Sequence, residues 1–284
     1  MSSDQVISQD EADAPDHRLP RFFIDWPIDQ VENDSISIDD AELKHQIEKV
    51  LRLKAAPNNQ EPPRAQLVLL PGDGRMWTAR LSPNMSSRCK STSIAFELLE
   101  HFQEESANPA RFVSRIYMPL IKPARFEMAL EKLTELGVDE IVPTQYERSQ
   151  YKAENYRKRI DRWSAICREA AEQSRRVRLP IIHQASTWQQ ALDDAVSDRG
   201  LMILLHERAN APDMVSLLCN RQPVEQNRLH IFLGPEGGIT DAESSSFIDK
   251  GAKLARLGDN ILRAETAAVV ALSAVTFAAN KIQD

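Results

Sequence analysis

The sequence predicts a small domain rich in short strands and turns at residues 18–110, followed by an α/β domain with a parallel sheet at 111–284. Two observations predict the α/β class. After Phe112, strand-like and helix-like segments alternate, which is the order of a sheet whose strands are connected by helices. The segments Leu201–Leu205 and Leu229–Leu233 consist almost entirely of apolar residues, as expected for parallel strands that are buried on both faces.

The chain begins with a polar segment, residues 1–17, whose first sixteen positions carry five acidic and no basic residues. Such a segment buries too little apolar surface to offset the entropy of ordering, so we expect a disordered tail. Residues 41–53 have the apolar spacing of a helix, and Asp39 or Asp40 is placed to cap its first turn. The small domain therefore contains at least one helix near its start.

A β-hairpin is predicted further along the small domain. The apolar run Ala65–Leu70 ends at the turn signal Pro71-Gly72-Asp73-Gly74, and Met76–Leu81 is the returning strand. Ile94–Phe102 is ambiguous, because its apolar residues fit the spacing of a strand and also that of a helix. From the pattern alone, both interpretations of this segment stay open.

In the α/β domain, the expected elements follow one another without long gaps. The strands are expected at 112–118, 138–143, 201–205, 229–233 and 253–257, and the helices at 124–136, 155–175, 188–196, 240–250 and 266–281. Gly137 is placed to end the first helix. Thr240 and Glu243 have the spacing of a capping box at the start of the fourth.

Composition excludes several classes of protein. The three cysteines are far apart and form no Cys-x-x-Cys pair, which argues against a disulfide framework and a thiolate metal site. The six histidines have no metal-ligand spacing. No apolar stretch is long enough to cross a bilayer, and no secretory signal is visible. We therefore expect a cytoplasmic protein with no metal and no membrane partner.

The charge is unevenly distributed along the chain. The formal net charge is −7, but residues 145–180 carry ten basic and five acidic side chains. A basic segment suits contacts with nucleic-acid phosphates. It is more often the solvated face of a helix, and charge alone favours that second interpretation.

The sharpest local motif is Leu233-Gly234-Pro235-Glu236-Gly237-Gly238, which follows an apolar strand and precedes a capped helix. Glycines at such a place let the backbone approach a ligand closely. The motif is neither of the known phosphate-binding glycine patterns, and Pro235 removes a backbone donor. It therefore predicts a site for a ligand other than a phosphate, unless it is only a tight turn.

Two further motifs carry charge at helix ends. Arg263 and Glu265 lead into a very apolar helix within the segment Leu257–Ala267, so they need partners or a ligand. Arg175 and Arg176 end the long helix and suit phosphate or base contacts. Simple ion pairs at the first motif, and capping of the helix by cations at the second, are the plainer alternatives.

Together, these motifs resemble the RsmE-type 16S rRNA (uracil-N3)-methyltransferases of the SPOUT superfamily, over roughly residues 19–280. The resemblance is carried, in chain order, by Pro20–Phe23, His45 with Val50-Leu51-Arg52, Lys122 with Glu127, Lys132 and Glu135–Val138, Glu147-Arg148-Ser149, Glu172-Gln173-Ser174 with Arg176 and Pro180, Leu205–Ala209, Gly234–Gly238, Leu257-Gly258 and Ile261–Ala267.

The resemblance implies a PUA-like β-barrel that binds RNA at 18–110 and a SPOUT methyltransferase domain with a trefoil knot at 111–284. In such a protein the ambiguous run 94–102 is a strand of the barrel. The resemblance also implies a homodimer that uses S-adenosylmethionine to methylate N3 of a specific uridine in the 16S rRNA of the small ribosomal subunit.

The resemblance assigns roles to three groups of residues. Cofactor binding falls to Leu205, His206, Leu233, Gly234, Pro235, Glu236, Gly237, Gly238, Leu257, Gly258, Ile261, Leu262, Arg263, Glu265, Thr266 and Ala267, with Ile239 and Leu262 against the apolar faces of the cofactor. Arg263 would stabilise charge on a uracil oxygen, and Glu236 or Glu265 is the candidate base. The candidate RNA contacts are Arg21, Arg52, Lys122, Arg148, Arg175 and Arg176.

Two other functions fit the sequence less well. A nucleotide-dependent oxidoreductase would need a Gly-x-Gly-x-x-Gly turn after its first strand and an acid about 20 residues later, and the sequence has neither. A non-catalytic RNA-binding protein would keep the barrel and the basic helix, but it would not need two complete cofactor loops.

Overall fold

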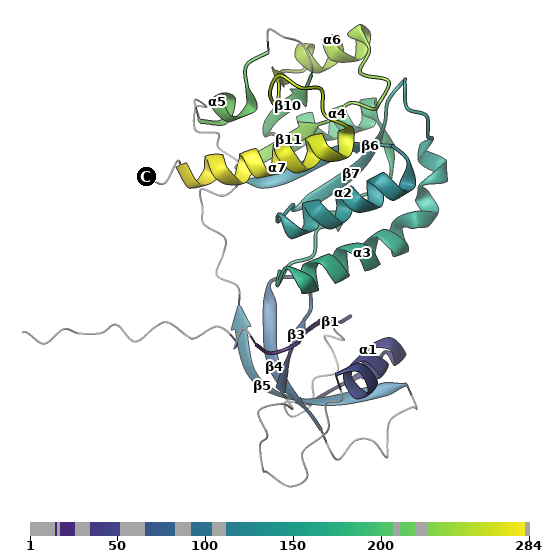
Figure 1. Cartoon of the computed structure of the whole chain (residues 1–284), viewed down its shortest axis with the longest axis vertical. Helices are drawn as coiled ribbons and strands as arrows, with labels where there is room; N and C mark the ends of the chain where they lie inside the picture. The colour runs from purple at the N-terminus through teal and green to yellow at the C-terminus, as the bar shows by residue number, and fades with distance from the viewer. Residues whose placement is uncertain are drawn as a thin grey trace, which may run out of the picture. The chain divides into compact units, whose positions relative to one another are not determined.

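The computed structural model describes residues 15, 18–25, 35–51, 66–82, 92–103, 112–206, 211–219 and 227–281 (Figure 1). The chain divides into two compact units, residues 1–105 and 106–284, each of which is described by itself. The predicted acidic tail lies outside the described residues except for Pro15.

The smaller unit is built on a five-stranded sheet with the strand order β1-β3-β4-β5-β2. β1 and β3 are parallel, and the other neighbours are antiparallel. The sheet is strongly curled in Figure 1, and alternate apolar side chains of its strands form one core. The strands are β1 (Arg21–Phe23), β2 (Ser35–Asp39), β3 (Gln66–Leu70), β4 (Arg75–Leu81) and β5 (Ser93–Gln103).

The predicted hairpin is confirmed by the antiparallel pair β3 and β4. Its turn needs glycine, because Gly72 and Gly74 have φ angles of 90° and 100°. The ambiguous segment 94–102 lies within β5 and is therefore a strand. The strands β1 and β2 were not predicted.

The predicted helix near residue 41 is also present, but it is short. α1 (Ala41–His45) is capped by Asp40, whose Oδ1 accepts hydrogen bonds from the backbone N–H groups of Glu42 and Leu43, both at 2.9 Å. It continues as one π-helical turn over Gln46–Val50. The helix therefore ends about three residues before the predicted boundary.

The larger unit contains a seven-stranded sheet in which β12, β10, β11, β6, β7 and β8 follow one another and β9 also pairs with β7. Every pairing in this sheet is parallel, which confirms the predicted parallel sheet. Its strands are β6 (Val113–Pro119), β7 (Glu140–Gln145), β8 (Ile181–Ile182), β9 (Ser186–Thr187), β10 (Leu201–Leu205), β11 (Arg228–Phe232) and β12 (Lys253–Ala255).

Helices pack on both faces of this sheet. One core joins the strands to α2 (Pro123–Glu135), α3 (Ile160–Gln173), α5 (Met214–Cys219) and α7 (Ala264–Lys281). The other face packs against α4 (Trp188–Asp198) and α6 (Asp241–Asp249). Because the strands are covered on both faces, they can be almost continuously apolar.

The path of the chain brings its last segments back towards the middle of the sheet. β12 is an edge strand beside β10, yet α7, which follows it, packs against α2, α5 and β6. The segment between β12 and α7 therefore crosses over the carboxyl ends of the strands. These ends are where open α/β sheets bind ligands.

The helix α3 ends on an unusual residue. Arg175 has a φ angle of 60°, and the N–H of Arg176 donates to the carbonyl of Ala171 at 2.9 Å, as in a helix end that normally uses glycine. An arginine in this left-handed conformation is strained by about 1–2 kcal/mol.

We therefore expect Arg175→Gly to raise the free energy of unfolding by about 0.5–1 kcal/mol, since glycine relieves the strain but is more flexible in the unfolded chain. Denaturant unfolding would measure the change. The matched control is Arg175→Ala, which removes the same side chain but keeps the strain. The expectation is wrong if the glycine variant is no more stable than the alanine variant.

A network of charged side chains lies near the amino-terminal ends of the strands, away from the crossover. Glu140 contacts Arg115 at 2.6 Å, Arg228 at 3.1 Å and His183 at 2.7 Å. Burial alone would raise the pKa of Glu140, but the hydrogen bond with His183 and the charge of Arg115 outweigh it and lower the pKa to about 2. The network therefore holds an ionised carboxylate inside the fold.

His230 is fully buried beside this network, with its Nδ1 3.2 Å from the hydroxyl of Tyr117. Burial, aided by the charge of Arg115, lowers the pKa of His230 from 6.5 to about 4. The imidazole of His230 therefore binds a proton more tightly in the unfolded chain than in the folded protein. As a result, the free energy of unfolding decreases as the pH falls from 6.5 towards 4. Glu140 adds a further loss between pH 4.5 and about 2, because its folded pKa is depressed.

Between pH 6.5 and 4, we expect the free energy of unfolding to fall by roughly 2–3 kcal/mol less in His230→Gln than in the wild type. Denaturant unfolding at several pH values would measure it in both proteins. An unchanged slope in the variant would show that another group takes up the proton.

Candidate cofactor site

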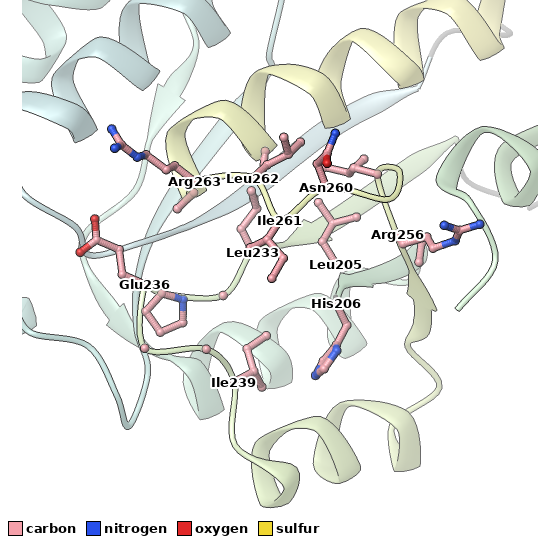
Figure 2. A pocket seen from close by; sticks show the side chains of 18 of the residues that line it. Leu205, His206, Leu233, Glu236, Ile239, Arg256, Asn260, Ile261, Leu262 and Arg263 are labelled. Atoms are coloured by element: carbon pink, nitrogen blue, oxygen red, sulfur yellow. The ribbon is translucent and has the colours of Figure 1, made fainter. Parts of the chain in front are cut away.

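Three loops meet at the carboxyl ends of neighbouring parallel strands. The first comprises Leu205, the last residue of β10, and His206 after it; the second is Leu233–Ile239 after β11; the third runs from Ala255 at the end of β12 to Ala264 at the start of α7. Together they line a cavity of about 540 Å³ (Figure 2). Both the place and the size are those of a small-ligand site.

Most of the predicted cofactor residues line this cavity. The structure brings together Leu205, His206, Leu233, Gly234, Pro235, Glu236, Gly237, Gly238, Leu257, Gly258, Ile261, Leu262, Arg263 and Ala267, and Ile239 lies with them. Glu265 and Thr266 do not line it. Ala255, Arg256, Asn260 and Ala264 also line the cavity; none was named as a cofactor residue, although Asn260 and Ala264 lie within the motif Leu257–Ala267.

The loop after β11 is shaped by its glycines. The N–H of Gly238 donates to the carbonyl of Pro235 at 2.8 Å, and this hydrogen bond closes a tight turn. Gly238 has a φ angle of 74° in this turn. A Cβ atom at Gly234 would lie 2.8 Å from Cγ1 of Ile239, and one at Gly237 would lie 2.9 Å from Cβ of Arg148. At both positions the backbone is packed too closely for a larger residue.

The helix after this loop is fixed by Glu243, which is fully buried. Thr240 and Glu243 form the predicted capping box at the start of α6. Glu243 Oε2 accepts from the N–H of Thr240, and its Oε1 accepts from the N–H of Glu147, both at 2.8 Å. The same carboxylate therefore anchors α6 and the loop after β7, which carries Arg148.

One side of the cavity is charged. Figure 2 shows Glu236 and Arg263 on this side and Arg256 on the opposite side. Glu236 forms an ion pair with Arg125 of α2, which also lies 3.7 Å from Glu265. Sequence reasoning missed Arg125, whose only signal is its place in the first turn of the helix that follows β6.

Apolar side chains form the middle of the lining, which also includes His206 and Asn260. Leu205, Leu233, Ile239 and Leu262 lie between the charged side and Arg256 (Figure 2). Such a cavity can hold an apolar, planar group with a polar end. No group of His, Cys, Asp or Glu side chains that could hold a metal ion is found in the described parts of the chain.

The candidate RNA contacts are scattered over the two units. Arg21 lies in β1, Lys122 and Arg175 are exposed at helix ends, and Arg52 lies outside the described residues. Arg148 lines the cavity and donates from Nη1 to the carbonyl of Gly237 at 3.2 Å. Their role in RNA binding stays a prediction.

The side chain of Arg176 forms hydrogen bonds within the fold. Its Nη1 donates to the carbonyl of Thr134 at 2.8 Å, and its Nη2 donates to the carbonyl of Val138 at 2.9 Å. The guanidinium therefore ties the end of α3 to the connection between α2 and β7.

Of the described helices, none is both long and apolar enough to span a membrane.

Known proteins resemble this chain in sequence and in fold. Residues 108–276 match the RNA methyltransferase domain family. A ribosomal RNA small subunit methyltransferase E from Synechocystis sp. is 31% identical over 247 residues, which are 87% of this chain and 74% of the relative.

Two solved structures share the fold along almost the whole chain. One, from Legionella pneumophila and described as a methyltransferase with bound SAM, has a TM-score of 0.74 and 26% identity over 92% of this chain and 98% of its own. The other, a ribosomal RNA small subunit methyltransferase E from Neisseria gonorrhoeae bound to S-adenosyl methionine, has a TM-score of 0.69 and 26% identity over 91% and 97%. The chain belongs to the RNA methyltransferase family and, within it, to the ribosomal RNA small subunit methyltransferases E.

Proposed function

We propose that this methyltransferase transfers a methyl group from S-adenosylmethionine to N3 of one uridine in the 16S rRNA of the small ribosomal subunit. The single observation that carries the proposal is the cavity at the carboxyl ends of β10, β11 and β12, built by glycines that leave no room for a Cβ atom. The small-subunit RNA follows from the name of the Synechocystis relative, and N3 follows from the motif resemblance.

The residues present fit the cofactor. The cavity of about 540 Å³ is large enough for a nucleoside with an amino-acid chain. Its apolar side chains, Leu205, Leu233, Ile239 and Leu262, suit the faces of an adenine ring, and the loops offer backbone groups for its polar edge. The solved structures from Legionella pneumophila and Neisseria gonorrhoeae hold this cofactor on the same fold.

S-adenosylmethionine supplies an electrophilic methyl group, so the protein must mainly orient the uracil and remove its N3 proton. Arg263, on the charged side of the cavity, stabilises the negative charge that develops on a uracil oxygen. Glu236 is the better placed of the two candidate bases, because it lines the cavity and Glu265 does not. A paired uracil hides N3, so the target uridine is unpaired or flipped out when it reacts.

The same proposal includes the knot and the domain roles. The N–H of Arg256, just after β12, donates to the carbonyl of Pro212 at 3.0 Å, and the carbonyl of Arg256 accepts from Met214 at the same distance. The chain thus runs beside the β10–β11 connection before α7 turns back to α2, which supports a trefoil knot in the SPOUT domain at 111–284. The curled sheet supports a PUA-like barrel at 18–110 that binds RNA.

We also propose that the active form is a homodimer in the cytoplasm, where ribosomal subunits are found. Two exposed apolar side chains support the dimer. Ile261, at the cavity, is 81% exposed, and Phe277, on the last helix, is 67% exposed. In a dimer, such side chains would gain stability if the second subunit covered them. Sedimentation of the purified protein would measure its oligomeric state.

Methyl transfer tests the proposed function directly. The protein would be incubated with S-adenosylmethionine labelled in its methyl group and with 16S rRNA, 23S rRNA or assembled small subunits as the acceptor. Label on the 16S rRNA, free or assembled, and not on the 23S rRNA is the expected result. Label on 23S rRNA alone, or on no acceptor although the cofactor binds, would contradict the proposal.

A further inference from the structure

Arg125 lies in the first turn of α2 and does not line the cavity, yet its guanidinium contacts two carboxylates beside it. Nη1 forms an ion pair with Oε1 of Glu236, and Nε lies 3.7 Å from Oε1 of Glu265. Glu236 belongs to the loop after β11, whereas Glu265 lies in the first turn of α7 after β12. One side chain from a third element thus connects the loop after β11 to the start of α7.

We propose that Arg125 is a positioning residue of the cofactor site, which acts through Glu236 and Glu265 and fixes the loop after β11 against the start of α7. This inference rests on the proposed use of the cavity for S-adenosylmethionine. It goes beyond that function, because it assigns the shape of the cavity to a side chain that lies outside it.

Burial makes the contact with Glu265 important. The side chain of Glu265 is only 4% exposed, and its Oε2 has no hydrogen-bond partner among the described residues. An ionised carboxylate in such a place needs a nearby positive charge. The amino end of α7 supplies part of it, and the guanidinium of Arg125 supplies the rest.

The chemistry of the side chain suits two partners at once. A guanidinium presents several N–H groups in a fixed plane, so Nη1 and Nε can face different carboxylates. A lysine at this position carries the same charge on a single nitrogen, and we expect it to hold one of the two loops.

Arg125 also separates charges at the cavity. Glu236 and Arg263 carry opposite charges and lie on the same side of the cavity in Figure 2. Because Arg125 holds the carboxylate of Glu236, the guanidinium of Arg263 stays available for the substrate. Loss of Arg125 should therefore disturb both the loops and the reacting groups.

The first test uses the protein without any cofactor. The N–H of Gly238 donates to the carbonyl of Pro235 within the loop after β11, and the N–H of Ala267 donates to the carbonyl of Arg263 at the start of α7, both at 2.8 Å. We expect hydrogen exchange at both N–H groups to be at least tenfold faster in Arg125→Met than in the wild type. Arg162→Met is the matched control, because Arg162 forms a similar ion pair with Glu127 of α2 and does not line the cavity. Unchanged exchange at both N–H groups would overturn the proposal, whether or not the protein binds the cofactor.

The second test measures S-adenosylmethionine binding by calorimetry. We expect the Kd to rise about tenfold in Arg125→Met, about threefold in Arg125→Lys and less than twofold in Arg162→Met. In a Glu236→Gln, Glu265→Gln background, Arg125→Met should change the Kd by less than threefold, since its partners are already neutral.

Thermal unfolding of each variant identifies any that fails to fold. An equal tenfold loss of affinity in both backgrounds would show that Arg125 does not act through the two carboxylates, and it would overturn the proposal. A wild-type protein that does not bind S-adenosylmethionine would refute the proposed function instead, and the exchange experiment would still decide the role of Arg125.

Discussion

Gly237→Val is expected to weaken S-adenosylmethionine binding by about tenfold to a hundredfold. A Cβ atom at this position would lie 2.9 Å from Cβ of Arg148 and 3.1 Å from its carbonyl oxygen, so the loop after β11 would have to move. Overpacking of this kind costs about 1–3 kcal/mol, and a hundredfold change in Kd corresponds to about 2.7 kcal/mol. Calorimetric titration would measure the Kd.

The control for this variant separates a damaged site from a less stable protein. Gly251 follows α6 with a φ angle of 93°, and a Cβ atom there would meet no other described atom within 4 Å. Gly251→Ala therefore strains the backbone without filling the cavity, which Gly251 does not line. It should lower stability by about 1 kcal/mol and leave the Kd within twofold. A Gly237 variant that binds as tightly as the wild type would show that the loop does not contact the cofactor.

Arg263→Ala is expected to lower kcat by about a hundredfold to a thousandfold, the usual cost of losing one group that stabilises transition-state charge. The Kd for S-adenosylmethionine should stay within threefold, because the apolar lining is intact. Arg263 is exposed at the cavity beside Glu236 (Figure 2), as a group that receives the substrate must be. Single-turnover methyl transfer to 16S rRNA would measure the change.

The matched control is Arg256→Ala, which removes the same charge from the opposite side of the cavity (Figure 2). Its kcat should fall by less than tenfold. If Arg263→Ala retains the wild-type kcat, or if both variants lose activity equally, Arg263 has no special part in the chemistry.

The sequence predicted those parts of the fold that have strong local patterns. Five of the seven strands of the parallel sheet, and the capping box of Thr240 and Glu243, were predicted because each is encoded within a few residues. β8 and β9 of that sheet, and β1 of the smaller unit, have two or three residues each and were not predicted. The alternation of Ile36 and Ile38 in β2 was present but overlooked.

The order of strands in the sheet is not a local property. β11 lies between β10 and β6, and β12 lies at the edge, because the chain crosses between layers whose packing depends on the whole core. The motif resemblance, and not the periodicity, carried the expectation of a knot. Local patterns therefore predict the elements of this fold but not their arrangement.

The site followed the same rule. The loops at Gly234–Gly238 and Leu257–Ala264 were predicted from their glycines and their place after strands, and they line one cavity. Arg125 was missed because it is 111 positions from Glu236 and meets it only in the folded chain. Nothing in the local sequence shows that Glu265 is buried near Arg125. The choice between Glu236 and Glu265 as the base stays a prediction.

The most direct test of the central claim is the identity of the methylated nucleoside. The protein would react with S-adenosylmethionine and 16S rRNA or small subunits from cells that lack the modification, and the RNA would be digested and analysed by mass spectrometry. Our account predicts one 3-methyluridine per RNA, which is lost in Gly237→Val. A methyl group on another atom of uracil, on the ribose or on another base would contradict it.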